Sequence, residues 1–273
     1  MKSFLLLPAL VLLEIPVFSQ FVYDPFSLNA AELQANKNAR VHFVRKYDVE
    51  EGVAPAEDSE FIGEVEYSAS GLPVQYSERE ENWDVEEGWS VISYTTYLFS
   101  GPNNQLSRIR TTDNDSYDVT TSFSYDTKGN LLLKEVADID PPTYEYGYEK
   151  GRITSCKVTQ QFPEFDENDN LTGRSDKVQT YQYSYTYDPT GRVAKEEMYE
   201  VQEGEDVLFQ VSTFEYNAKG QLFRLTSYFG DDLGTPAHTT TYTYNEKGLL
   251  LKMKEEDGLM GIDLTYEFRY IYF

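Results

Sequence analysis

Hydrophobic and polar residues alternate with a period of two over long stretches of this chain. Tyr181, Tyr183, Tyr185 and Tyr187 fall on one face of an extended segment, whereas Gln182, Ser184 and Thr186 fall on the other. The same alternation recurs at residues 144–148, 214–216 and 242–244. It is typical of an antiparallel sheet with one buried face and one face in water. We therefore expect strands whose aromatic rings share a shielded interior.

A short motif separates these segments: Tyr, then Asp or Asn, two variable residues, Gly, one further residue and an aliphatic. Its four clearest copies supply the turn residues Tyr125, Asp126 and Gly129; Tyr187, Asp188 and Gly191; Tyr216, Asn217 and Gly220; and Tyr244, Asn245 and Gly248. Asp or Asn favours the first position of a type I turn, and Gly at the fourth position tolerates positive φ. Each copy therefore predicts the tip of a β-hairpin. Weaker copies begin at Tyr67 and Tyr148.

The repeat predicts an all-β chain. We expect roughly sixteen strands between residues 40 and 273, joined as an antiparallel meander of repeated hairpins. The sheet should curl into a bent single sheet or a partly closed barrel, with the tyrosines inside.

These residues resemble the YD repeat of the Rhs family, in which a Tyr-Asp step is followed by Gly and an aliphatic. The similarity extends from about residue 67 to the end of the chain and is sharpest between Tyr125 and Leu250. In large members of that family such repeats form a β-sheet shell around another domain, and related repeats serve cell-surface contact. This chain is far shorter and looks more like the small secreted YD-repeat proteins of Bacteroidota than like those large members.

The N-terminal residues predict export. Lys2 precedes an apolar run, and Val17-Phe18-Ser19 forms a suitable cleavage site, so residues 1–19 are interpreted as a signal peptide. Residues 20–39 form an N-terminal segment in which residues 27–37 favour a short helix packed on the first strand, at 41–47. Residues 40–273 form the YD-like β-repeat domain. The expected location is periplasmic or secreted.

Charge and cysteine content exclude some classes of partner. The chain has 47 acidic and 23 basic residues, a formal net charge of −24. Nucleic acid and anionic membrane surfaces would repel it, because both are bound through Lys and Arg. Its single cysteine, Cys156, excludes an internal disulfide and is interpreted as a small buried hydrophobe. No cofactor is expected.

Two segments carry candidate binding chemistry. Trp83 and Trp89 stand beside acidic residues such as Asp84 and Glu86, and an indole beside carboxylates is suited to holding a sugar. The alternative is that both indoles simply cover the sheet at a hairpin end.

In the second segment, Asp166, Asn168 and Asn170 place alternate oxygens as at the start of a calcium loop. Leu171 stands where that loop needs Gly, and Lys177 where it needs Glu, so a solvated hairpin loop is the preferred interpretation.

The favoured hypothesis is a non-enzymatic envelope or secreted protein that binds a glycan or another envelope protein on its concave or hairpin-tip face. Sheet edges also permit self-association. An outer-membrane barrel is an alternative, because residues 266–273 alternate aromatics and end in Phe. A cryptic glycoside hydrolase is a weaker one, because no two carboxylates stand out as a pair.

Overall fold

A computed structural model describes residues 30–49, 61–81, 89–100, 105–113, 118–126, 131–137, 142–165, 171–230 and 233–273. Within these ranges there is one helix, α1 (Ala30–Ala39), and sixteen strands. The strands are β1 (Val41–Asp48), β2 (Gly63–Tyr67), β3 (Pro73–Glu81), β4 (Trp89–Ser100), β5 (Gln105–Asp113), β6 (Asp118–Tyr125), β7 (Leu131–Ala137), β8 (Thr143–Glu149), β9 (Arg152–Phe165), β10 (Leu171–Tyr187), β11 (Val193–Gln202), β12 (Glu205–Tyr216), β13 (Leu222–Phe229), β14 (His238–Tyr244), β15 (Leu250–Asp257) and β16 (Ile262–Tyr272). The all-β prediction is confirmed.

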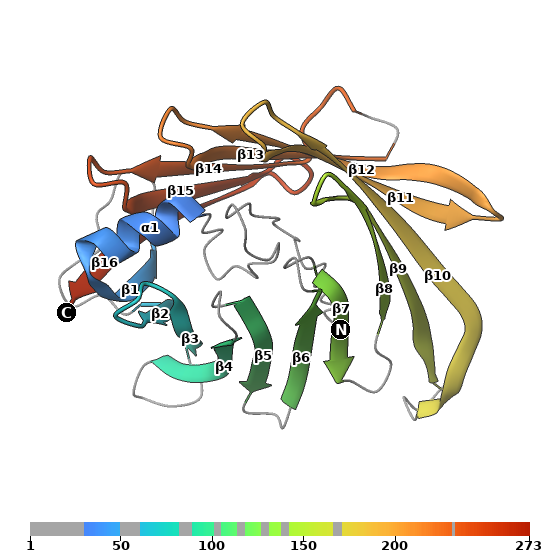
Figure 1. The fold of residues 1–273 in the computed structure, drawn as a ribbon, viewed down its shortest axis with the longest axis horizontal. Helices are drawn as coiled ribbons and strands as arrows, with labels where there is room; N and C mark the ends of the chain where they lie inside the picture. Colours follow the sequence, from blue (N-terminus) through green and yellow to red (C-terminus); the bar gives the residue numbers. More distant parts are fainter. Residues whose placement is uncertain are drawn as a thin grey trace.

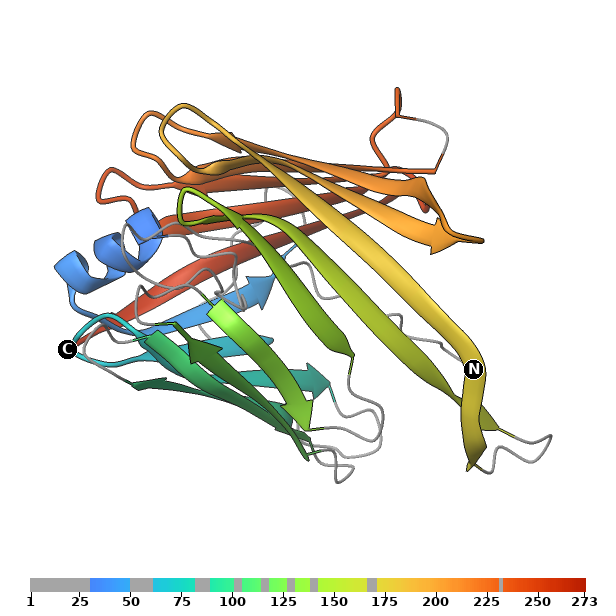
Figure 2. The same cartoon turned by 45° about the vertical axis from the view of Figure 1, so that its right-hand side comes forward.

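All sixteen strands belong to one antiparallel sheet. Each strand pairs with its neighbour in the chain, except that β7 and β8 form the two ends of the sheet and β1 pairs with β16. The sheet curls strongly (Figures 1 and 2), and the side chains of its two end strands meet: Lys134 Nζ on β7 donates to the Tyr144 hydroxyl on β8 at 3.2 Å. Backbone hydrogen bonds do not pair β7 with β8, so the structure is a bent single sheet that is not closed into a barrel.

The repeated turns have the geometry that the motif predicts. At the β10–β11 turn, the Gly191 N–H donates to the Asp188 carbonyl at 2.9 Å and the Asp188 N–H to the Arg192 carbonyl at 2.8 Å. Gly191 has φ of 93°, the left-handed region that only glycine enters cheaply. The same two hydrogen bonds recur in the β12–β13 and β14–β15 turns. Of the first copy, Gly129 lies outside the described residues.

The motif tyrosines join each hairpin to the one before it. The Tyr216 hydroxyl on β12 donates to the Val193 carbonyl at 2.9 Å, and the Tyr244 hydroxyl on β14 donates to the Leu222 carbonyl at 2.7 Å. Equivalent bonds link Tyr125 to Leu106, Tyr187 to Ile153 and Tyr270 to Leu250. The acceptor is an aliphatic residue at or next to the start of an outgoing strand. The rings are therefore packed inside, as expected, while their hydroxyls satisfy backbone carbonyls.

Helix α1 packs against the same turns. Leu33 and Ala35 are buried, and a Cβ at Gly248 would lie 3.4 Å from that of Ala35. The predicted helix began at residue 27, but the structure describes the chain only from residue 30. Arg40 ends the helix with φ of 57°, and its carbonyl accepts a hydrogen bond from the Phe273 N–H. This places the C-terminus beside the helix (Figure 1).

Candidate functional site

The sites predicted from the sequence fall mostly outside the described residues. These are Trp83, Asp84, Glu86, Asp166, Asn168 and Asn170. Trp89 is the first residue of β4 and pairs with Glu81, but its side chain is not described. Both sites therefore stay predictions, and the structure draws attention to a different place.

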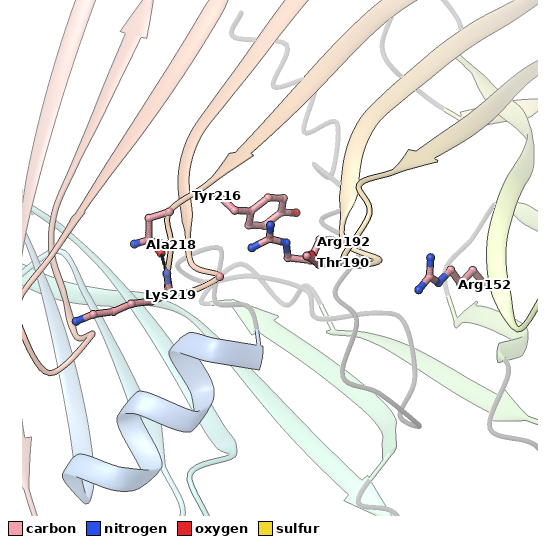
Figure 3. Close-up of a pocket in the computed structure, with 8 residues that line it drawn as sticks. Arg152, Thr190, Arg192, Tyr216, Ala218 and Lys219 are labelled. Carbon is pink, nitrogen blue, oxygen red and sulfur yellow. Dashed lines mark hydrogen bonds between the residues drawn. The ribbon is translucent and has the colours of Figure 1, made fainter.

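A groove of about 770 Å³ lies where three hairpin turns pass side by side. Its walls come from the β8–β9, β10–β11 and β12–β13 turns, at the end of the sheet that carries α1 (Figure 3). The lining residues are Arg152, Thr190, Arg192, Tyr216, Asn217, Ala218, Lys219 and Gly220. Three cations among eight residues is unusual in a chain with a net charge of −24.

Arg192 is held in the wall of the groove by two neighbours. Its Nε donates to Asp188 Oδ2 at 2.8 Å, and its guanidinium carbon lies 4.3 Å from the centroid of the Tyr216 ring. That ring is itself fixed, because its hydroxyl is bonded to the Val193 carbonyl. A guanidinium placed in advance loses little side-chain entropy when it binds a ligand.

Asp188 organises the turn from which Arg192 projects. Its Oδ1 accepts the backbone N–H groups of Thr190 and Arg192, both at 2.9 Å, and the Thr190 hydroxyl at 2.8 Å. Burial opposes ionisation of this carboxylate, but the hydrogen bonds from Arg192 and Thr190 outweigh it and lower the pKa of Asp188 to about 2. Asp188 is thus ionised at neutral pH.

The other two cations are also placed by neighbouring turns. Lys219 Nζ donates to the Glu246 carbonyl at 2.8 Å, across the gap to the β14–β15 turn. Asn217 Oδ1 accepts the Lys219 N–H at 2.9 Å and fixes the backbone beneath it. The Arg152 guanidinium lies 5.3 Å from the Tyr187 ring. The basic residues of the lining thus come from three separate turns, and the Lys219 side chain is directed toward the β14–β15 turn (Figure 3).

A second polar cluster lies inside the sheet, on β7, β9 and β11. Burial lowers the pKa of Lys134 to about 8 and raises that of Glu196 to about 8. Burial also raises the pKa of Cys156 to about 12, so its thiol is protonated at neutral pH and is a poor nucleophile. Cys156 is 1% exposed, which confirms the expectation of a buried residue.

In the described ranges, no group of three or more His, Cys, Asp or Glu side chains is arranged to hold a metal ion. No helix there has the length and apolarity that crossing a membrane requires.

Sequence reasoning missed the groove, although the repeat carries a signal for it. The residue before or after the turn glycine is basic in Lys150-Gly151-Arg152, Gly191-Arg192, Lys219-Gly220 and Lys247-Gly248. Because these turns are equivalent in a meander, basic residues beside the turn glycines gather at one end of the sheet.

No family model matches the chain, and no curated protein matches it. Among solved structures, a porin-like protein from Bacteroides uniformis is similar with a TM-score of 0.46 and 11% identity, over 85% of this chain and 98% of that one. A porin-like protein from Bacteroides vulgatus gives 0.44 and 11%, over 85% and 99%.

The TcdB2-TccC3-TEV structure is also similar, with a TM-score of 0.27 and 15% identity, over 74% of this chain and 13% of that one. At these identities and TM-scores the neighbours carry no function over to this chain.

Proposed function

We propose that this chain is a non-enzymatic, exported β-repeat protein that binds a glycan in the groove at its hairpin tips. The single observation that carries the proposal is the groove itself, one open depression lined by charged and polar residues of three turns. The sequence predicts binding on either the concave face or the hairpin-tip face, and the groove lies on the hairpin-tip face.

The lining suits a sugar chain in its chemistry. Hydrogen-bond donors are supplied by Arg152, Arg192 and Lys219. The Thr190 hydroxyl donates a hydrogen bond to Asp188, and its oxygen can still accept one from a ligand. Ala218 is small and exposed, so the floor stays open at the β12–β13 turn. An open groove of this kind fits the side of an extended chain better than it fits an enclosed small molecule.

Glycan-array binding of the exported chain tests the proposal, with Ala218→Tyr as the blocking variant. Ala218 is a central residue of a type I turn, a position that accepts most side chains. Ala69→Tyr is the matched control, because Ala69 is exposed, holds the equivalent position in the β2–β3 turn and does not line the groove.

We expect Ala218→Tyr to weaken binding of any array ligand by about tenfold or more, and Ala69→Tyr to change it by less than about twofold. Binding that is equal in both variants would place the glycan elsewhere. The absence of any glycan ligand for the unmodified chain would refute the proposed function.

A further inference from the structure

We propose that the groove is one part of a longer basic edge, and that this edge recognises a linear acidic polysaccharide with carboxylates on alternate sugars. The edge runs along the turns from β8–β9 to β14–β15. This inference rests on the proposed function and specifies its ligand.

The first observation is the charge of the turns at this end. They carry the cations Lys150, Arg152, Arg192, Lys219 and Lys247 and the acids Glu149, Asp188 and Glu246. Asp188 and Arg192 form an ion pair, with Nη2 to Oδ2 at 2.6 Å, so the remaining charge is four cations against two acids. The edge is therefore positive overall, although the whole chain carries −24.

The opposite end of the same strands has the reverse charge. The β11–β12 turn carries Glu203, Glu205 and Asp206, all exposed, and the β15–β16 connection is flanked by Asp257 and Asp263. No Lys or Arg occurs at 203–206 or at 257–263. Charge is thus segregated along the strand direction, and an anionic ligand is attracted to the turn edge and repelled from the opposite end.

The second observation is the spacing of the cations. Turns of successive hairpins at one end are separated by two strand spacings, which is about 10 Å. Contacts between the turns hold this spacing: Gln221 Nε2 donates to the Gly248 carbonyl at 2.7 Å, and Lys219 Nζ donates to that of Glu246. A polysaccharide with a carboxylate on every second ring repeats over a comparable length, so successive anions meet successive turns.

Charge density distinguishes this ligand from a nucleic acid. Duplex DNA carries one charge per about 1.7 Å of its axis, far denser than one turn per about 10 Å. The remaining negative charge of the chain would repel such a dense polyanion. A sparse polycarboxylate matches the edge instead, because guanidinium groups pair well with single carboxylates and the sugar hydroxyls between them can bond to groups such as Thr190.

The experiment measures binding of hyaluronan, which has carboxylates on alternate sugars, by calorimetry at low salt. Carboxyl-reduced hyaluronan and inorganic polyphosphate are the comparison probes. Two double variants remove positive charge at opposite ends of the edge: Lys150→Gln with Arg152→Gln, and Lys219→Gln with Lys247→Gln. The control, Arg108→Gln with Lys157→Gln, removes the same charge from exposed positions on β5 and β9.

We expect each edge variant to weaken hyaluronan binding by about tenfold, the control by less than about twofold, and carboxyl reduction to abolish binding. If carboxyl-reduced hyaluronan bound as tightly as hyaluronan, the inference that the ligand is acidic would be overturned, while the proposed glycan function would stand. If polyphosphate bound as tightly as hyaluronan, the assignment of a polysaccharide as the ligand would be overturned. If only one edge variant weakened binding, the turns would not act as one edge. If neither hyaluronan nor any array glycan bound, both proposals would fail.

Discussion

Asp188 offers a sharp test of how the motif works, because the repeat supplies its own control. Other copies have Asn at this position, and Asn217 Oδ1 accepts the N–H groups of Lys219 and Gln221 at 2.9 and 3.0 Å. Asp188→Asn should therefore keep the turn hydrogen bonds and lose only the ion pair with Arg192. Asp188→Ala should lose both.

The magnitude follows from the pKa of Asp188, which is lowered from 3.8 to about 2. At about 1.4 kcal/mol per pKa unit, this lowering corresponds to about 2–3 kcal/mol of stabilisation by ionised Asp188. Its side chain is 17% exposed, so solvent screening reduces the contribution to about 2 kcal/mol. We expect Asp188→Asn to cost about 1 kcal/mol at pH 7 and Asp188→Ala about 2–3 kcal/mol, since the latter also leaves backbone N–H groups without their acceptor.

The sign of the pH dependence is fixed by the lowered pKa. The contribution of ionised Asp188 is fully present above the unfolded-state pKa of about 4 and is lost as the pH falls through about 2. Urea unfolding followed by tyrosine and tryptophan fluorescence, at several pH values between 2 and 7, measures this. The free energies of unfolding of the unmodified chain and of Asp188→Asn should converge between about pH 4 and pH 2. Equal losses for Asn and Ala at pH 7, or a difference that does not change with pH, would refute the reasoning.

Three further predictions concern the interior. Tyr216→Phe should lower the free energy of unfolding by about 1 kcal/mol, because the Val193 carbonyl loses its donor, whereas Tyr272→Phe at the exposed end of β16 should have no measurable effect in the same urea titration. Burial raises the pKa of Glu196 to about 8, so its proton stabilises the fold most below about pH 4.5 and this contribution is lost as the pH rises through 8. Glu196→Gln should therefore raise stability at pH 9 by about 2 kcal/mol and have little effect at pH 4, and an unchanged pH profile would contradict the assignment. Cys156 should react with iodoacetamide only after urea unfolding, as mass spectrometry would show, and rapid labelling of the folded chain would disprove its burial.

Much of the fold could be predicted from local sequence, because turn chemistry and strand alternation are short-range properties. Asp188, the fixed φ of Pro189 and the positive φ of Gly191 are sufficient to specify a hairpin tip without knowledge of its neighbours. The alternation at residues 181–187 likewise specifies which side chains face inward. The hydroxyl bond from Tyr216 to Val193 was not predicted, because it joins residues 23 positions apart in the sequence.

The sequence by itself determined the strands, their turns and the shielded side of each strand, since all three depend on residues within a few positions of one another. Only the tertiary structure decided that β1 pairs with β16, that β7 and β8 remain the ends of the sheet, and that Arg152, Arg192 and Lys219 line one groove. Closure of a sheet depends on the twist and bend accumulated over all its strands, and no local pattern records that sum. The groove depends on the same curvature, because it is formed where turns from separate repeats are brought side by side.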